Sequence, residues 1–198
     1  MARYFIADVH LGHASVATRR GFSTVEQHDE TVLGQLQALT ASDELYILGD
    51  LSSGRPHEED RALELLSGIQ PLTHFIAGNH DSIASINRNG WKRRAAFDAV
   101  FASVRDFAVI RVNGQQVLLS HYPYAATGDG PGRGPARYTE FRLPDVGELL
   151  IHGHTHQSTP HADNPRELCV SWEVRRGIAH EAEANEWVAA RRATREAF

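Results

Sequence analysis

The sequence contains a single cysteine, Cys169, and therefore cannot form a disulfide within the chain. Such sparse use of cysteine is typical of a protein in a reducing compartment. Cys169 stands between Leu168 and Val170 in a stretch that we expect to be a strand. We therefore expect a buried, small apolar side chain at this position rather than a reactive thiol.

The sequence also lacks a long hydrophobic run and a strong excess of charge. The apolar run near the N-terminus is too short for a secretory signal, and the polar residues Asp8 and His10 end it. No other stretch is long or apolar enough to span a membrane. The net charge of −5 gives no overall attraction for nucleic acid or an anionic membrane. We expect a soluble, cytoplasmic protein without a membrane partner.

What the chain does have is the composition of an ordinary globular domain. Of its 198 residues, 41% are hydrophobic and 23% are charged, which suits one domain with a sizeable core. It contains no internal repeat and no linker long enough to separate two domains. We predict a single domain over residues 1–198.

The spacing of apolar residues predicts both strands and helices. We expect strands at 3–10, 43–50, 72–81, 147–156 and 166–174, and a hairpin at 107–123 that turns at Asn113-Gly114. We expect helices at 22–39, where Ser23 and Glu26 form a capping box, at 55–68, within 82–103 and at 180–198. Helices alternate with strands at first and strands dominate later, so the class is α/β with mixed sheets.

Five expected strands end in side chains that can bind metal ions. These are Asp8 and His10, Asp50, Asn79 and His80, His121, and His154 and His156. In layered α/β folds the loops at strand ends converge, so five such endings in order predict one shared site. The alternation of His152, His154 and His156 further predicts that these three side chains point to one side of their strand.

The residue types indicate the kind of metal. Carboxylate, amide and imidazole ligands together suit Mn, Fe, Zn or Co ions rather than a thiolate-bound structural zinc. Seven ligands out of these eight side chains are already too many for one ion, but they divide over two ions if one carboxylate bridges them. Two ions about 4 Å apart form the clamp that is used for phosphoester hydrolysis.

At this point the sequence resembles a known family. The blocks "ADVHLGH", "LGDLSS", "AGNHD", "LSHYP" and "HGHTH" come one after another between residues 7 and 156. In type and order they are similar to the Asp-x-His, Gly-Asp, Gly-Asn-His-Asp/Glu, His and Gly-His-x-His blocks of calcineurin-like metallophosphoesterases. The "HLGH" block with the downstream "VEQHDE" looks closest to a small, single-domain branch with bacterial and phage members.

The resemblance implies a fold and a set of roles. The fold would be a four-layer αββα sandwich, with two mixed β-sheets flanked by helices. Asp8, His10 and His156 would hold a first metal ion, Asn79, His121 and His154 a second, and Asp50 would bridge them. A hydroxide shared by both ions would attack phosphorus, while His80 would stabilise the transition state or protonate the leaving oxygen. Asp81 would orient His80.

Some positions match no block, and their interpretations stay open. Many relatives carry an acidic or amide residue shortly after the bridging aspartate, where this chain has Ser52 and Ser53. His152 would pack at the strand end or support a ligand, and His13 would line the pocket or lie on the surface. In the glycine-rich loop 126–141, Arg133 or Arg137 could reach a substrate phosphate, although a flexible loop is the simpler interpretation. The "WKRR" segment at 91–94 would form a solvated helix face.

The resemblance implies an enzyme with two divalent ions, Mn²⁺ foremost, with Fe, Zn, Co or Ni as alternatives. We expect a phosphodiesterase that acts on cyclic nucleotides or small nucleotide diesters. The alternatives are a phosphomonoesterase acting on nucleotides or phosphoproteins, and a metal-binding scaffold without catalysis. The partner would be a small phosphoester substrate rather than nucleic acid, and a homodimer stays open.

Overall fold

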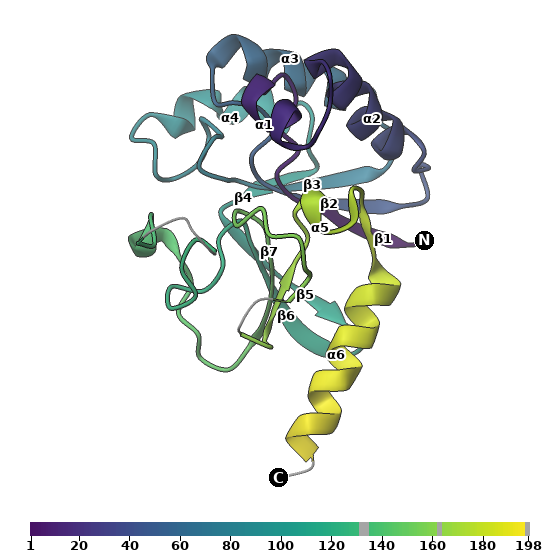
Figure 1. Ribbon diagram of the computed structural model, residues 1–198, viewed down its shortest axis with the longest axis vertical. Coiled ribbons are helices and arrows are strands. Elements are labelled where there is room, and N and C mark those ends of the chain that lie inside the picture. Colours follow the sequence, from purple (N-terminus) through teal and green to yellow (C-terminus); the bar gives the residue numbers. More distant parts are fainter. Residues whose placement is uncertain (131–134, 162–163, 197–198) are drawn as a thin grey trace.

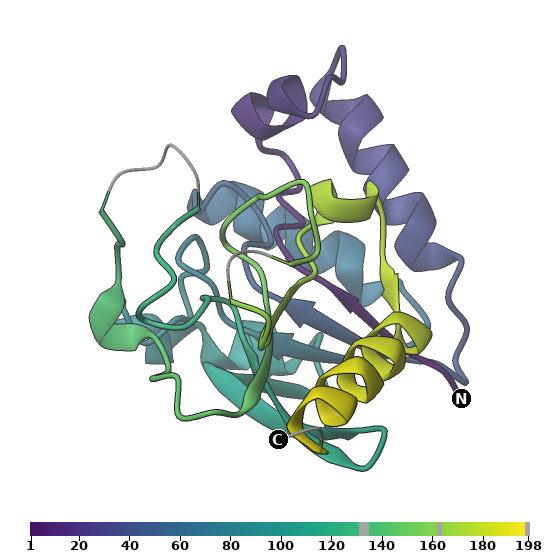
Figure 2. The same cartoon turned by 60° about the horizontal axis from the view of Figure 1, so that its bottom comes forward.

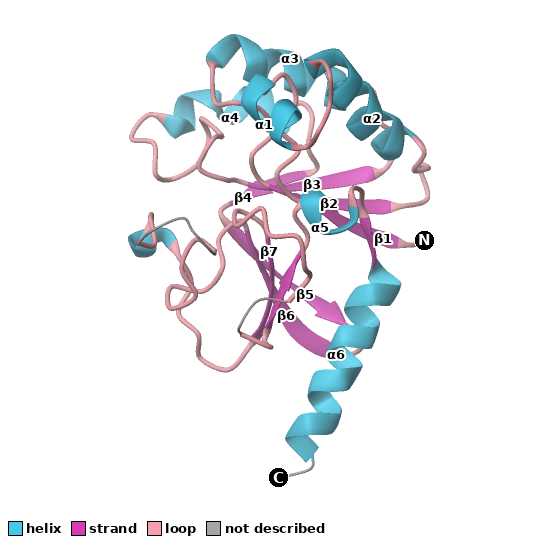
Figure 3. Ribbon diagram, in the orientation of Figure 1, coloured by secondary structure: helices cyan, strands magenta, loops and turns pink. Residues whose placement is uncertain are grey.

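The computed structural model describes residues 1–130, 135–161 and 164–196. Within them, two β-sheets pack against each other between layers of helices (Figures 1 and 3). The first sheet has the strand order β4-β3-β2-β1-β9, and the second has the order β5-β6-β7-β8. The first contains β1 (Arg3–Ile6), β2 (Glu44–Leu48), β3 (Leu72–Ile76), β4 (Ser103–Arg105) and β9 (Ala179–His180). The second contains β5 (Phe107–Val112), β6 (Gln115–Ser120), β7 (Leu149–His152) and β8 (Glu167–Cys169).

Both sheets are mixed. Strands β1 to β4 run parallel, and β9 joins β1 in the antiparallel direction. In the second sheet β5 and β6 form the predicted hairpin, and β6, β7 and β8 run parallel. Asn113 and Gly114 turn the hairpin with φ of 46° and 78°, the left-handed values that a two-residue turn requires. Because most strands are parallel, their carboxyl ends collect at one edge of each sheet.

The two faces of the first sheet are buried in two separate cores. On β2, Leu45 and Ile47 join the core under the helices, and Tyr46 and Leu48 join the core between the sheets. This alternation follows from the two-residue period of a strand. Since both faces are covered, β1 to β3 are continuous apolar runs, as parallel strands usually are.

Helices form the outer layers (Figures 1 and 2). The helices α1 (Ala14–Arg19), α2 (Val25–Gln37), α3 (Pro56–Ser67) and α4 (Arg94–Asp98) lie outside the first sheet. The C-terminal helix α6 (Glu181–Glu196) packs beside β1, β5 and β9, and its Trp187 and Val188 enter the core between the sheets. The expected α/β class and αββα sandwich are thus confirmed.

Several expected boundaries were wrong by a few residues. The cap of α2 is Thr24 rather than Ser23, and its side chain accepts a hydrogen bond from the Gln27 amide. The expected helix within 82–103 is reduced to a 3-10 turn, Gly90–Arg93, followed by the short α4. The expected strand 166–174 ends at Cys169, and Trp172–Arg175 form a short helix, α5, because the chain must turn back toward β9.

The strand β7 also stops earlier than expected. It ends at His152, so His154 and His156 lie in the following loop and not on one strand face. Among the described residues, no helix is long and apolar enough to cross a membrane.

Candidate metal centre

The candidate ligands meet at the carboxyl ends of five strands from both sheets. Asp8 and His10 follow β1, Asp50 follows β2, Asn79 follows β3, His121 follows β6, and His154 and His156 follow β7. The sheets face each other, so loops that are distant in sequence come together at this edge. The structure brings all seven candidate ligands into one cluster.

Four of these residues surround one point. One side-chain ligand atom each from Asp8, His10, Asp50 and His156 lies within 4.8 Å of all the others. The Nε2 atoms of His10 and His156 are 3.3 Å apart, and His10 Nε2 is 3.7 Å from Asp50 Oδ2. Asp8 Oδ1 lies 3.5 Å from His156 Nε2.

The remaining ligands surround a second point on the other side of Asp50. His121 Nε2 lies 3.3 Å from Asn79 Oδ1 and 3.5 Å from Asp50 Oδ1. His154 Nδ1 lies 3.2 Å from His121 Nε2. Asp50 therefore presents Oδ2 to the first group and Oδ1 to the second.

The backbone at these ligands is strained. Asp8, His10, Asp50, His154 and His156 have φ between 46° and 69°, in the left-handed region that side-chain-bearing residues seldom adopt. Such strain persists only where surrounding structure enforces it, and it gathers at functional sites. In a continuing strand, successive side chains would alternate between the two faces of the sheet. The left-handed turns instead direct the ligand side chains toward the cluster.

Glycines in the motifs make room for the ligands. A Cβ on Gly78 would lie 2.4 Å from Asp50 Oδ1, and one on Gly153 would lie 2.3 Å from the Cβ of Ala7. Neither distance is physically tolerable. The glycine of "GNHD" and that of "GHTH" are therefore required by close approach between loops.

Each histidine ligand is braced through the ring nitrogen that faces away from the cluster. His10 Nδ1 donates to the carbonyl of Ser52, and His121 Nδ1 donates to that of Leu48. His156 Nδ1 donates to Glu173 at 2.7 Å, and His154 Nε2 lies 3.3 Å from Asp129. These partners fix the tautomer, so that the inward nitrogen of each ring carries a lone pair.

Glu173 and Asp129 support two of the candidate ligands and could not be identified from the sequence. Burial alone would raise the pKa of Glu173, but His156 and Arg20, which lies 2.9 Å away, lower it to about 2. Burial would likewise raise the pKa of Asp129, but Arg137, His154 and Arg142 hold it well below its usual range. Neither carboxylate stands in a recognisable motif, and only the fold brings them to the histidines.

The pairing of Asp129 also corrects the expectation for the glycine-rich loop. Arg137 Nε lies 2.6 Å from Asp129 Oδ2, so this guanidinium supports the centre instead of extending toward a substrate. Arg142 binds the other carboxylate oxygen. Arg133, the second candidate in this loop, lies outside the described residues.

The electrostatics of the cluster suit a bound cation. Burial and the neighbouring His156 lower the pKa of His10 well below its usual value, and burial with His121 lowers that of His154 to about 2. The imidazoles of His10 and His154 are therefore neutral, the form that binds metal. Burial also raises the pKa of Asp8, a penalty that a divalent ion would reverse. Converging lone pairs beside buried carboxylates thus fit metal ions.

Asp81 does not have the predicted role. Its carboxylate accepts hydrogen bonds from the backbone amides of Asp50, Leu51 and Gly78, at 2.7 to 2.9 Å. The Nδ1 atom of His80 instead donates to the carbonyl of Ser53 at 2.9 Å. The expectation that Asp81 orients His80 was therefore wrong, because Asp81 clamps the two ligand loops together.

Ser52 and Ser53 explain how the chain departs from the common pattern without losing the site. They support His10 and His80 through backbone carbonyls, which any residue could supply. His13 lies beside the centre, with its ring centroid 5.2 Å from that of His10 and 5.8 Å from that of His80. His152 is buried at the end of β7 and donates from Nδ1 to the Gly153 carbonyl, so it packs the strand end.

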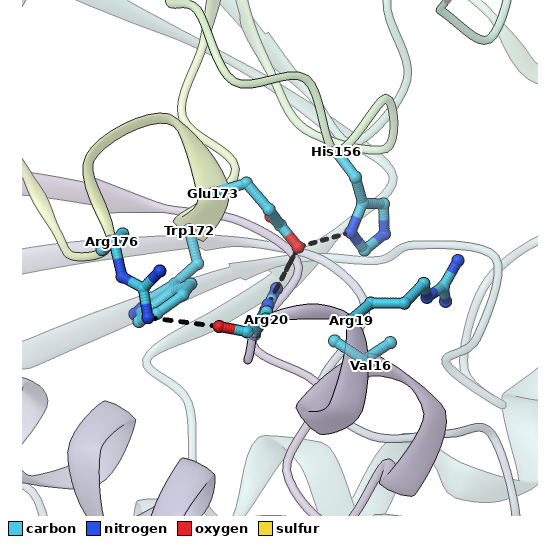
Figure 4. A pocket seen from close by; sticks show the side chains of 7 residues that line it. All are labelled: Val16, Arg19, Arg20, His156, Trp172, Glu173 and Arg176. Atoms are coloured by element: carbon cyan, nitrogen blue, oxygen red, sulfur yellow. Dashed lines mark hydrogen bonds and ion pairs between the residues drawn. The ribbon is translucent and has the colours of Figure 1, made fainter. Parts of the chain in front are cut away.

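Two pockets open beside the cluster. The first, of about 270 Å³, is shown in Figure 4, where Glu173 stands between His156 and Arg20, and Val16 and Arg19 of α1 form the opposite wall. The second, of about 570 Å³, lies on the side of Asn79 and His80 and extends to Asn89, Lys92 and Arg93. We call the second one the His80 pocket. Its volume is that of an ordinary small-molecule site.

Comparison with known proteins agrees with this geometry. The calcineurin-like phosphoesterase superfamily domain matches residues 1–182. The chain belongs to this superfamily. It is therefore a member of a group of metal-dependent phosphoesterases, as the sequence motifs predicted, and its Asp and His cluster is a potential metal-binding site.

The chain is similar to two phage proteins in sequence and to a protein of known structure in fold. The Gene 66 protein of Mycobacterium phage L5 is 36% identical over 162 residues, which are 77% of this chain and 76% of the relative. The Gene 66 protein of Mycobacterium phage D29 is 31% identical over 194 residues, which are 93% of this chain and 94% of the relative. A protein of unknown function from Aquifex aeolicus has a TM-score of 0.67 at 22% identity and covers 93% of this chain and 98% of its own. That last likeness concerns the fold alone.

Proposed function

We propose that this calcineurin-like phosphoesterase is a phosphodiesterase with two divalent metal ions, acting on small nucleotide diesters or cyclic nucleotides. The observation that carries the proposal is the position of Asp50, with one carboxylate oxygen toward each of two ligand groups. Asp8, His10 and His156 complete the first group, and Asn79, His121 and His154 the second. Mn²⁺ is the foremost candidate, followed by Fe, Zn, Co and Ni, because the ligands are carboxylate, amide and imidazole.

The ions, when bound, would supply Lewis-acid stabilisation of the phosphate and activation of water as the nucleophile. Side chains of the protein would orient the metal ligands and supply the proton that the leaving oxygen takes up. With its Nδ1 atom engaged by the Ser53 carbonyl, His80 keeps Nε2 as the atom that can donate to the leaving oxygen. Glu173 and Asp129 keep His156 and His154 in the required orientation, as outer carboxylates do in other metal sites.

The complete ligand set favours an enzyme over a non-catalytic scaffold. A scaffold that had lost catalysis would not need His80, which contributes no metal-binding atom in this arrangement. The choice between diester and monoester substrates has to come from kinetics.

The test is hydrolysis of bis-para-nitrophenyl phosphate and of para-nitrophenyl phosphate by protein that has been stripped with a chelator and reloaded with Mn²⁺. We expect activity that depends on metal and favours the diester. A preference for the monoester would change the assignment to a phosphomonoesterase. Two bound ions with no activity on either compound would favour the scaffold.

A further inference from the structure

The His80 pocket has an unusual lining for a site in an acidic protein. Asn79, Asn87 and Asn89 contribute amides and Ser53 and Ser82 contribute hydroxyls, and no carboxylate is among the described residues that line it. The chain as a whole has a net charge of −5. A pocket without acidic groups in such a chain favours an anionic ligand over a cationic one.

Two cationic side chains reach this pocket, and one of them is already neutralised. Arg93 pairs with Glu59 at 3.0 Å and with Asp60. Glu59 is buried and also accepts hydrogen bonds from the amide and hydroxyl of Ser82. Arg93 therefore belongs to the framework of the wall.

Lys92 is the unpaired cation of the pocket. In the described part of the chain its ammonium group has no carboxylate partner, and its recorded contact is with the ring of Trp91 at 5.7 Å. Three arginines near the metal centre differ, because Arg20, Arg137 and Arg142 are each paired with a carboxylate. Lys92 is also the single lysine of the sequence, which otherwise uses arginine for its basic residues.

We propose that Lys92 binds a second phosphate, carried by the leaving group of the substrate. This inference rests on the proposed function, because His80 serves the leaving oxygen only if the centre hydrolyses phosphoesters. The pocket that His80 lines must then receive the leaving group, and Lys92 lines the same pocket. An ammonium group suits a phosphate as a compact point charge with three donors.

The inference selects among the substrates of the proposed function. A cyclic mononucleotide has one phosphate, which the metal centre would hold, and it offers nothing to Lys92. A linear diester whose leaving nucleotide bears a further phosphate offers one phosphate to the metal centre and the other to Lys92. In the reaction, the oxygen of water bonds to phosphorus and releases a proton to solvent, and the bond from phosphorus to the leaving oxygen breaks. That oxygen takes a proton from Nε2 of His80 in its imidazolium form, and solvent then returns a proton to His80.

The first experiment compares three dinucleotides with protein loaded with Mn²⁺. TpT has no terminal phosphate, whereas pTpT has one at its 5′ end and TpTp one at its 3′ end. We expect kcat/KM for one of the two to exceed that for TpT by about ten-fold. If the extra phosphate lies on the leaving group, pTpT gives two molecules of thymidine 5′-phosphate, or TpTp two of thymidine 3′-phosphate. Equal values of kcat/KM, or thymidine 3′,5′-bisphosphate as the main product of the preferred substrate, would overturn the inference.

Variants assign the preference to the lysine. Lys92→Ala should reduce the ratio of kcat/KM for the preferred phosphorylated dinucleotide to kcat/KM for TpT by about five-fold or more. Arg88→Ala is the matched control, because Arg88 is an exposed cation of the same segment and is not among the residues that line the pocket. An unchanged ratio in Lys92→Ala, or an equal loss in Arg88→Ala, would contradict a role for Lys92. A longer single strand that is cleaved much better than the dinucleotides would indicate an oligonucleotide as the source of the phosphate.

The second experiment does not depend on turnover. Lys92 is the single lysine of the sequence, so mass spectrometry can follow its acetylation separately from that of the N-terminal amine. Thymidine 3′,5′-bisphosphate should slow acetylation of Lys92 by about five-fold, whereas thymidine 5′-phosphate at the same concentration should not, and the N-terminal amine is the internal reference. Lack of protection overturns the inference. If no substrate is hydrolysed, the proposed function fails, and protection alone still supports the phosphate site.

Discussion

At the scale of single residues, the strain in the ligand turns shows what the site requires. Five candidate ligands adopt left-handed backbone conformations at a cost in stability, and each turns a side chain toward the cluster. Away from the ligands, the described non-glycine residues with such conformations are Asn113, Tyr138 and Arg176. The cost is thus concentrated where the chemistry needs it.

Asp50→Ala should remove metal from both positions, because its two oxygens face the two ligand groups. We expect the metal content of reloaded protein, measured by mass spectrometry of the eluted ions, to fall from two ions to fewer than one. Glu30→Ala, which changes an exposed carboxylate on α2, should keep both ions. Full metal content in Asp50→Ala would rule out the bridging assignment.

His80→Ala should separate metal binding from turnover. The side chain donates to the Ser53 carbonyl and offers no ligand atom, so the variant should keep its metal content while kcat falls by about 100- to 10,000-fold. The measurement pairs metal analysis with hydrolysis of the diester. A variant that hydrolyses as fast as the parent would show that His80 is only a structural neighbour.

At the scale of elements, the ligand loops depend on close contact between strands of different sheets. Gly153 follows β7 and packs against Ala7, which follows β1, while the Asp8 carboxylate accepts from the His154 amide and the Ser171 hydroxyl. Asp81 joins the loops after β2 and β3 in the same way. The site is held by loop-to-loop contacts and not by any one strand.

Gly153→Ala should therefore lower the free energy of unfolding by about 1–3 kcal/mol, because its methyl group collides with Ala7. Gly34→Ala is the matched control. Gly34 lies in the last turn of α2 with open space around it, so alanine should raise the free energy of unfolding there by about 0.5–1 kcal/mol. Urea denaturation measures both, and a Gly153→Ala protein as stable as the parent would contradict the packing argument.

At the scale of the whole molecule, the site lies above the core between the two sheets. Cys169 at the end of β8 is buried in this region, and burial raises the pKa of its thiol to about 11. The thiol should therefore react with a disulfide reagent at pH 8 only as fast as the protein unfolds. The rate of thiol modification should rise with urea concentration over the same range in which the circular dichroism signal of the folded protein is lost. A rapid reaction in the native protein would show that the sheets separate locally.

Much of this fold could be predicted, because each buried strand is a short apolar run and each ligand follows one directly. The α/β class, the hairpin at Asn113-Gly114 and α3 after Pro56 were all readable from local patterns. The end of β7 could not be predicted from such local patterns. The alternating histidines predicted a continuing strand, whereas close packing of Gly153 against Ala7 turns the chain after His152.

The sequence by itself determined the ligand types, their order and the family, because these depend on residues within a few positions of one another. Only the tertiary structure decided which groups support them. Glu173 and Asp129 reach His156 and His154 through the packing of α5 and of the loop after β6, and Asp81 proved to clamp backbone amides. It also decided that Lys92 shares a pocket with His80, which lies twelve residues earlier in the chain. Such pairings arise from how segments pack, a property that no local pattern of residues records.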